Sequence, residues 1–259
     1  MFARLASVTV VALLSLSPPQ SQTDEIVALK REVERLKAQQ VLMQRDLDTI
    51  KSLLQSLVQG RQQEESFADK SIIITDAPTK GNASAKVTVV EVSDYHCPYC
   101  RRQNLQTMPQ LFADYVNTGK IKYVFVDYPI AQLHPDAFLS HEAAACAGDQ
   151  GKYWQMHDLL FTNSPSREVS QLTANAGMLG VDTKKFEECM NGGKGSKYAP
   201  AIRQSIARMQ QLGVGGTPLV LVGLTPAAGS PMKVISFVYG AKPYPEFKAA
   251  IDTALAQAR

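Results

Sequence analysis

A seven-residue repeat of apolar side chains runs through residues 24–60. With Ile26 as the first a position, nine of the ten a and d positions over five heptads are apolar, and the exception is Gln40. The apolar seam positions are Ile26, Leu29, Val33, Leu36, Met43, Leu47, Ile50, Leu54 and Leu57. No proline occurs in this stretch and no glycine precedes Gly60. The repeat therefore predicts a coiled-coil helix that associates with further copies of itself.

The charged residues beside this seam favour a parallel arrangement. In parallel chains each g position faces an e position of the partner helix, and the three resulting pairs all join opposite charges. These pairs are Glu25 with Lys30, Glu32 with Lys37 and Asp46 with Lys51. The a and d residues do not distinguish a dimer from a trimer, and Gln40 is expected to fix the register. A solvated single helix is the alternative, but it leaves the apolar seam without a purpose.

After Gly60 the pattern changes to that of a mixed α/β domain. Residues 61–70 are polar and predict a linker, and residues 71–259 predict the folded domain. Apolar runs predict strands at Ser71–Thr75, Val87–Val92, Ile121–Tyr128, Leu219–Val222 and Val234–Val238. One long helix at Pro98–Val116 separates the second and third strands, which is the arrangement of a βαβ unit.

Between the third and fourth strands, residues from about 134 to 212 carry only helical signals. Helices are predicted at Asp136–Ala147, Tyr153–Phe161, Val169–Leu179, Thr183–Met190 and Ile202–Leu212, and a last one at Tyr244–Gln257. Strands that flank a helical block predict a helical insertion into a small α/β domain. The predicted fold class is therefore α/β with an inserted helical subdomain, preceded by a coiled-coil helix.

The N-terminus has the layout of a secretory signal at residues 1–21. Arg4 precedes an apolar stretch at Leu5–Leu16, and small and polar residues follow at 17–21. The stretch is short for a spanning helix, so export is favoured over an uncleaved anchor. Export places the chain in an oxidising compartment, where its four cysteines can persist as disulfides. The net charge of +3 gives no electrostatic reason to expect a nucleic-acid partner.

Cys97 and Cys100 stand where the second strand gives way to the long helix. Thiols at i and i+3 of a helical first turn lie on one face and can bond to each other or exchange with a substrate disulfide. Cys97 begins the helix, so the free backbone N–H groups and the helix dipole favour its thiolate and make it the expected nucleophile. Pro98 suits the first helical position because it has no N–H to leave unpaired. Cys100, one turn further in, is the expected resolving thiol.

The remaining cysteines, Cys146 and Cys189, fall in two different predicted helices of the insertion. In an exported protein a structural disulfide is favoured, and two buried free thiols are the alternative. A structural zinc site would need a second close pair beside Cys97 and Cys100, and neither residue supplies one. No metal and no cofactor is therefore expected. His96, next to the nucleophile, is expected to face solvent, although it could tune Cys97.

The motif at residues 97–100 after an apolar strand, the helical block, and Gly216-Thr217-Pro218 together resemble the DsbA-type thioredoxin-like disulfide oxidoreductases of bacterial periplasms. The resemblance covers about residues 71–259. It implies a thioredoxin fold with an inserted helical subdomain and a cis bond between Thr217 and Pro218. It also implies that Gly216, Thr217 and Pro218, with Pro98 and Tyr99, line the substrate-binding surface. A loop of this kind would offer backbone groups to an extended substrate peptide.

The resemblance also assigns a role to Glu91, six residues before Cys97. It implies a buried acid that moves a proton for the resolving cysteine. A lone carboxylate in an apolar strand has its pKa raised by desolvation, which suits that task. The alternative is an outward-facing strand residue.

Two places in the sequence depart from DsbA itself. DsbA carries an acidic residue where Asn104 stands, and a Pro-His pair where Pro98-Tyr99 stands. The Pro-Tyr pair and Thr217 resemble isomerase-type members, and a coiled-coil stalk is similar to that of oligomeric proteins that suppress copper sensitivity. The direction of exchange is therefore left open, with isomerase or interchange activity favoured slightly.

The sequence as a whole predicts an exported, periplasmic, self-associating protein thiol:disulfide oxidoreductase. The expected partners are substrate proteins with cysteines or disulfides, a membrane redox partner and further copies of the chain, bound through residues 24–60. The alternative is a copper-binding or chaperone module that uses the same cysteine pair.

Overall fold

The computed structural model describes residues 20–258 apart from 65–66, 75, 164, 167 and 192–193. The predicted signal at residues 1–21 lies almost entirely outside the described residues. The chain divides between Leu57 and Val58 into two units, each considered by itself. None of the helices in the described part is long and apolar enough to cross a membrane.

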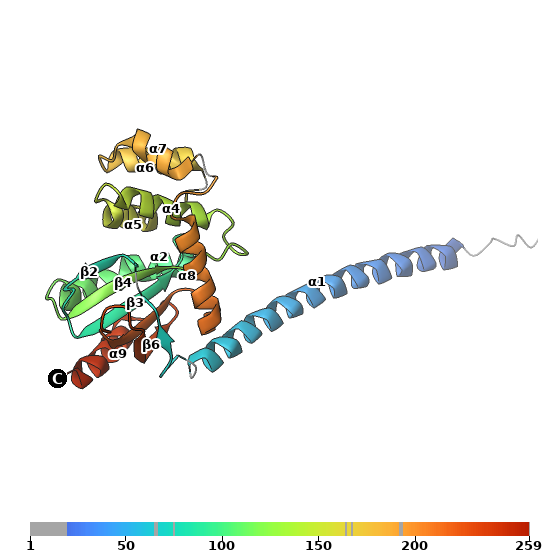
Figure 1. The fold of residues 1–259 in the computed structure, drawn as a ribbon. Helices are drawn as coiled ribbons and strands as arrows, with labels where there is room; N and C mark the ends of the chain where they lie inside the picture. Colours follow the sequence, from blue (N-terminus) through green and yellow to red (C-terminus); the bar gives the residue numbers. More distant parts are fainter. Residues whose placement is uncertain are drawn as a thin grey trace, which may run out of the picture. The chain divides into compact units, whose positions relative to one another are not determined.

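The N-terminal element is the helix α1, Gln20–Glu64, which has 45 residues (Figure 1). At 1.5 Å per residue it is roughly 68 Å long. It includes residues 61–64, which the sequence assigned to a linker. A single glycine costs a helix only about 1 kcal/mol, and the residues after Gly60 are good helix formers, so the helix continues through it.

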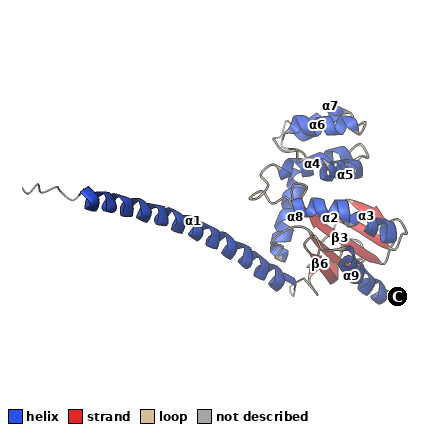
Figure 2. Ribbon diagram, turned by 180° about the vertical axis from the view of Figure 1, so that it is seen from behind, coloured by secondary structure: helices blue, strands red, loops and turns tan. Residues whose placement is uncertain are grey.

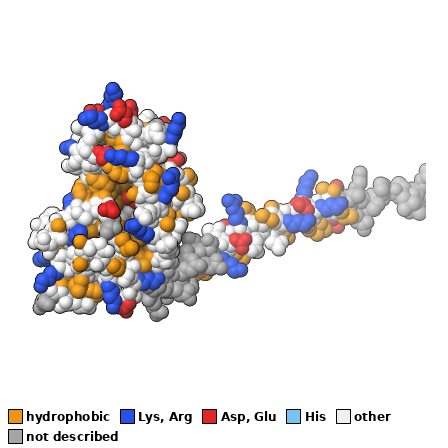
Figure 3. All heavy atoms as spheres, in the orientation of Figure 1, with side chains coloured by type: hydrophobic (Ala, Val, Ile, Leu, Met, Phe, Trp, Pro, Cys, Tyr) orange, Lys and Arg blue, Asp and Glu red, His pale blue; other side chains and the backbone are white. Residues whose placement is uncertain are grey.

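The apolar seam of α1 lies on its surface. Eight of the nine apolar seam side chains are described, and their exposed fractions range from 44% to 64%. They are Ile26, Leu29, Val33, Leu36, Met43, Leu47, Ile50 and Leu54. Figure 3 shows hydrophobic side chains along α1 between the charged ones. An apolar stripe of this length on a single helix indicates a surface suited to another helix.

The second unit is built on a six-stranded sheet with the order β1-β6-β5-β3-β4-β2. The strands are β1 Ser71–Ile72, β2 Thr79–Gly81, β3 Val87–Ser93, β4 Ile121–Asp127, β5 Leu219–Leu224 and β6 Met232–Tyr239. β3 and β4 are parallel, as the predicted βαβ unit requires, and β5 runs antiparallel to β3. The mixed sheet with helices on its faces confirms the predicted α/β fold class.

Nine helices and one π-helical turn are found among the described residues. They are α1, α2 Pro98–Gln106, α3 Met108–Leu111, η1 Phe112–Val116, α4 Ala137–Gly148, α5 Tyr153–Thr162, α6 Val169–Met178, α7 Thr183–Met190, α8 Ala199–Leu212 and α9 Tyr244–Gln257. The insertion therefore consists of α4 to α8, close to the predicted ranges. Figures 1 and 2 show α6 and α7 stacked on α4 and α5, which lie nearer the sheet.

Alternation along β3 divides the core between the two faces of the sheet. Val87 and Val89 join a cluster with residues of α2, α3, α9 and the insertion. Val90 and Val92 point to the other face and pack with Met209 of α8. Every residue of β3 is buried, because helices cover both faces of this central strand.

The predicted helix Pro98–Val116 is broken at Thr107. α2 ends at Gln106, Thr107 has a φ of −108°, and α3 begins at Met108 with Pro109 in its first turn. Pro109 has no N–H to give to the carbonyl of Leu105, so one continuous helix would lose a hydrogen bond and meet a clash there. A new helical start places the proline where it is tolerated.

The first predicted strand, Ser71–Thr75, is shorter in the structure and a second strand follows it. β1 pairs with β6 only at Ser71 and Ile72. Asp76 then has a φ of +64°, and Pro78 cannot donate to a ladder. The chain therefore leaves that edge of the sheet and forms β2 at the opposite edge, beside β4. The run of three isoleucines suggested a longer strand, but Ile73 is 47% exposed.

The end of the predicted linker belongs to the folded domain. Phe67 is fully buried and packs edge-on against Phe237 at 5.5 Å between ring centroids. Lys70 Nζ donates to the carbonyl of Leu212 at 2.8 Å. Asp69 pairs through its backbone N–H with the carbonyl of Val234. Polarity alone suggested a linker over 61–70, yet one aromatic residue anchors its second half.

Candidate active site

Cys97 is the N-cap residue of α2, directly after the turn that follows β3. Its backbone is extended, with φ −72° and ψ 122°, and its N–H donates to the carbonyl of Asp94 at 3.1 Å. Pro98 follows within the first turn, as its missing N–H allows. The Cys97 sulfur thus faces the free N–H groups at the positive end of the helix dipole.

The two thiols of the motif are both free and both buried, but their acidities differ. The pKa of Cys97 is lowered to about 6, chiefly by hydrogen bonding from the Cys100 thiol and further by the N–H groups of Cys100 and Tyr99. The pKa of Cys100 is raised well above its usual range because the side chain is desolvated and lies beside Cys97. Near neutral pH the pair therefore holds one thiolate and one thiol.

Thr217 and Pro218 lie beside this pair and are joined by a cis peptide bond, as the resemblance implied. The Cys97 sulfur lies 3.5 Å from the carbonyl oxygen of Thr217, to which the protonated thiol donates. The loop reaches this place because β5 starts at Leu219, which pairs with Val92 near the end of β3. Cys97 and Thr217, 120 positions apart in the sequence, thus meet beside the end of the central strands β3 and β5.

Gly216 and Tyr99 flank the pair in different ways. A Cβ on Gly216 would lie 3.0 Å from the Tyr239 hydroxyl, so the loop approaches β6 closely there. Pro98 and Tyr99 are exposed, and the Tyr99 ring, 57% exposed, lies under the Arg102 guanidinium at 5.2 Å. The surface around Cys97 is therefore partly aromatic and open to solvent.

Glu91 is fully buried on β3, which makes the outward-facing alternative wrong. Tyr123 of β4 donates its hydroxyl to Glu91 Oε2 at 2.6 Å. Burial raises the pKa of Glu91, and the hydrogen bond from Tyr123 offsets part of that rise. Ser93, two residues on, lies on the same face of the strand and affects the pKa of both Glu91 and Cys100.

Asp94 is a buried carboxylate at this site that sequence reasoning missed. It accepts hydrogen bonds from the backbone N–H of His96 and of Ile130, each at 2.8 Å, and lies 2.9 Å from His134 Nδ1. It thus fastens the turn before Cys97 to the start of the insertion. The sequence feature that could have indicated Asp94 is its place as an acidic residue between an apolar strand and the cysteine motif.

His96 is half-buried and does not simply face solvent, contrary to expectation. Its Nε2 lies 2.9 Å from the Ser140 hydroxyl of α4. Desolvation lowers the pKa of His96. The residue thus connects the motif to the insertion through a neutral hydrogen bond.

Cys146 of α4 and Cys189 of α7 form a disulfide, with 5.8 Å between their Cα atoms. This is the pairing that the sequence favoured over two free thiols. The bond joins the two layers of the insertion and contributes no group to the site around Cys97.

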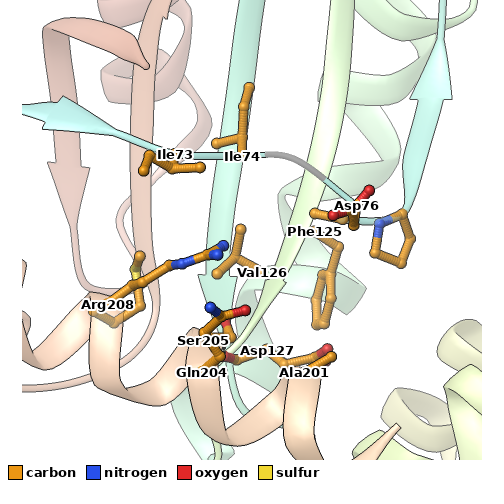
Figure 4. Close-up of a pocket in the computed structure, with 13 residues that line it drawn as sticks. Ile73, Ile74, Asp76, Phe125, Val126, Asp127, Ala201, Gln204, Ser205 and Arg208 are labelled. Atoms are coloured by element: carbon orange, nitrogen blue, oxygen red, sulfur yellow. Dashed lines mark hydrogen bonds between the residues drawn. The ribbon is translucent and has the colours of Figure 1, made fainter. Parts of the chain in front are cut away.

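Other places in the described residues offer less chemistry. No group of three or more His, Cys, Asp or Glu side chains among them could hold a metal ion. A cavity of about 110 Å³ lies between residues 73–78, β4 and α8, and Val126 and Arg208 are among its lining residues (Figure 4). Cys97 and Cys100 do not line it.

Comparison with known proteins agrees with this geometry. A family model described as thioredoxin matches residues 75–231. A Na(+)/H(+) antiporter NhaA 1 of Salinispora arenicola is 35% identical over 143 residues, which are 55% of this chain and 21% of the antiporter. A probable disulfide bond formation protein D of Bacillus anthracis is 25% identical over 150 residues, 55% of this chain and 67% of that protein. The chain thus spans only about a fifth of the antiporter.

Solved structures give the same result. A thioredoxin-like oxidoreductase from Silicibacter pomeroyi is 30% identical, with a TM-score of 0.56 over 70% of this chain and 92% of that one. Wolbachia pipientis α-DsbA1 has a TM-score of 0.62 at 18% identity, over 72% of this chain and 94% of that one. The chain therefore belongs to the thioredoxin family, and its fold is similar to that of α-DsbA1.

Proposed function

We propose that this chain is a protein thiol:disulfide oxidoreductase that exchanges disulfides with substrate proteins through Cys97 and Cys100. The observation that carries the proposal is the opposite shift of the two pKa values, to about 6 for Cys97 and well above the usual range for Cys100. A thiolate attacks a disulfide, and a buried neutral thiol is held back until the mixed disulfide has formed.

In the exchange, the Cys97 thiolate attacks one sulfur of a substrate disulfide, and the other sulfur leaves as a thiolate. Cys100 then loses its proton to Glu91 and attacks the Cys97 sulfur. This step forms the Cys97–Cys100 disulfide and releases the substrate thiolate. Glu91 suits the role because it is fully buried and burial raises its pKa, which makes its carboxylate a stronger base.

The substrate-binding surface is formed by the loop at residues 216–218 and the exposed pair Pro98-Tyr99. The Thr217 carbonyl lies against the Cys97 sulfur, so backbone groups of this loop are available to an extended peptide placed over the sulfur. Tyr99 offers an exposed ring to apolar side chains of such a peptide.

The place of action that we propose is the periplasm, after export by the signal at residues 1–21. Two features support it: the apolar stretch Leu5–Leu16 behind Arg4, and the Cys146–Cys189 disulfide, which persists in an oxidising compartment. We further propose parallel self-association through residues 24–60, supported by the exposed apolar seam of α1. A membrane redox partner would then restore the cysteine pair.

Refolding of a scrambled, multi-disulfide substrate tests the proposed activity. The Cys97→Ala variant is expected to lose the activity, and Cys100→Ala to accumulate a mixed disulfide with the substrate, seen on a non-reducing gel. If Cys97→Ala retains full activity, the proposal is wrong. The reduction potential of the pair against glutathione then separates oxidase from isomerase use, since roughly 30 mV corresponds to 1.4 kcal/mol.

A further inference from the structure

Five polar side chains lie buried together beneath the cysteine pair, on the face of the sheet that α2 and α5 cover. This buried polar cluster consists of Glu91, Ser93, Gln103, Tyr123 and His157, each no more than 1% exposed. Tyr123 bonds to Glu91, and Ser93 and Gln103 are weaker hydrogen-bonding neighbours that lower its pKa. Five other polar atoms of the cluster make no hydrogen bond of full geometry among the described residues. They are Glu91 Oε1, Ser93 Oγ, Gln103 Oε1, Gln103 Nε2 and His157 Nε2.

Buried polar groups without full hydrogen bonds destabilise the folded protein. An unpaired buried polar atom has lost its hydrogen bonds to water without replacement, and native proteins leave few of them. Their concentration around one carboxylate therefore indicates a functional reason. The proposed exchange uses Glu91 but does not explain how its proton reaches solvent.

His157 of α5 lies above β4, close to the Glu91 carboxyl. Phe125 is the residue directly opposite Glu91 in the pairing of β3 with β4. The His157 ring packs edge-on against Phe125 at 4.8 Å. Trp154, one turn earlier, contacts both the His157 ring at 5.1 Å and the ring of Tyr123, which binds Glu91, at 5.8 Å. A charge on His157 also lowers the pKa of Glu91, although burial outweighs it.

The two ring nitrogens of His157 face different surroundings. Nδ1 lies 2.8 Å from Oδ1 of Asp158, whose side chain is 57% exposed. A carboxylate can only accept, so Nδ1 carries a proton and donates it. In the neutral ring Nε2 then holds a lone pair, and it is buried without a partner. The acceptor thus faces the interior, and the donor faces an exposed carboxylate.

We propose that His157 passes the proton of Glu91 to solvent through Asp158 each time Cys100 resolves a mixed disulfide. The inference rests on the proposed function, which gives Glu91 the Cys100 proton. The Glu91 carboxyl then passes its proton to His157 Nε2 through a water molecule, because the two groups are not hydrogen-bonded to each other. The Nδ1 proton moves to Asp158 and to water. Glu91 is left as a carboxylate for the next cycle. No electrons move in these steps; the substrate disulfide is the oxidant in the exchange itself.

Other titratable and charged groups surround His157. The facing groups are Glu91 of β3, Tyr123 of β4, Tyr95 before α2, and Tyr153 and Asp158 of α5. Further out lie Arg101 of α2, which donates to the Thr162 carbonyl at the end of α5, and His141 and Asp127 beyond Tyr95. Burial raises the pKa of all three tyrosines well above the usual range, so they stay neutral. The tyrosines therefore take no part in the proposed relay, which runs from Glu91 to Asp158.

Single-turnover oxidation of the reduced full chain by oxidised glutathione tests the proposal. Acid quenching and mass spectrometry follow the Cys97–glutathione mixed disulfide and its conversion to the Cys97–Cys100 disulfide. In His157→Gln the conversion is expected to slow by about 10²-fold, the low end for a positioned proton-transfer group. Its rate should also acquire a steeper rise with pH, while formation of the mixed disulfide keeps the wild-type rate. Asp158→Asn should slow the same step.

His141→Gln is the matched control. His141 is equally buried, pairs through Nδ1 with Asp127 at 2.5 Å and contacts Tyr95, but it is not among the groups that act on Glu91. Wild-type conversion in both His157→Gln and Asp158→Asn, or equal slowing in His141→Gln, overturns the relay. If His157→Gln fails to fold, the exposed Asp158→Asn decides alone. A wild-type chain that forms no mixed disulfide would instead reject the proposed function.

Discussion

At the scale of single residues, the site depends on a difference in pKa between two cysteine thiols. Cys97 and Cys100 are three residues apart, yet the pKa of one is lowered and that of the other is raised. Position on the helix explains the difference. Cys97 stands before the first turn and receives its N–H groups, whereas Cys100 is one turn inside and fully desolvated.

The lowered pKa of Cys97 predicts its reactivity towards alkylating reagents. The rate of iodoacetamide modification should follow the thiolate and fall to half near pH 6, because the pKa is about 6. Stability of the reduced form follows the same group: a lowered pKa stabilises the folded state at alkaline pH, and this contribution is lost as pH falls through about 6. Measurement of the modification rate from pH 4 to 9 by mass spectrometry, with Cys97→Ala as control, checks the midpoint. A midpoint close to that of a free thiol would contradict it.

The raised pKa of Glu91 predicts a pH-dependent stability difference in Glu91→Gln. A raised folded pKa means that the carboxyl contributes stability below its unfolded pKa and loses it as pH rises through the folded pKa. The uncharged variant escapes that loss and keeps an oxygen for Tyr123. Urea unfolding should therefore find the variant more stable than wild type at pH 8, with the difference shrinking towards pH 4. A constant difference across this range would count against a buried ionising group.

Only part of this site could be found in the sequence. Residues 97–100 and Thr217-Pro218 are recognisable because they are contiguous motifs. Asp94 and His157 were missed because their roles depend on which partners the fold brings to them. His157 lies within the predicted helix Tyr153–Phe161, and no spacing along the chain indicates that its ring lies above the strand residue opposite Glu91.

At the scale of elements, apolar patterns predicted the four longer strands and most helices but not the breaks between them. The apolar pattern did not take account of Pro109, which divides the helix after the cysteine motif. β2 has three residues and no apolar alternation, so it depends on the edge that β4 offers. The predicted linker ended early because Phe67 fills a place beside Phe237. In each case tertiary packing or one residue's backbone outweighed the average pattern.

The disulfide between α4 and α7 is an element-scale contribution to stability. It closes a loop of 43 residues, for which the chain-entropy model gives roughly 4 kcal/mol. The double variant Cys146→Ala/Cys189→Ala, which leaves no unpaired thiol, should lose about that much free energy of unfolding in urea. Its exchange with glutathione through Cys97 should remain, because the bond contributes no group to that site. An unchanged unfolding midpoint would mean that the bond constrains little in the unfolded chain.

At the scale of the whole molecule, α1 must either associate or expose its seam to water. The ion pairs of the single helix do not settle this, because they join neighbours on one chain. Glu32 binds Arg35 and Glu34 binds Lys37, all on exposed side chains. Such pairs contribute only about 0.3–0.5 kcal/mol each. Burial of the apolar seam between helices is the larger effect, at roughly 25 cal/mol per Å².

Two lysine substitutions distinguish association through the apolar seam from nonspecific association of the helix. Leu36 occupies a d position and Val41 a b position outside the seam, and both are exposed in the single helix, at 53% and 68%. In a coiled coil Leu36→Lys buries a charge in the seam, whereas Val41→Lys stays in solvent. Light scattering should therefore find the wild-type oligomer for Val41→Lys and a lower mass for Leu36→Lys. A chain shortened to begin at Phe67 keeps its aromatic anchor and should be monomeric. Equal masses for both lysine variants, or an oligomer without α1, would place the contact elsewhere.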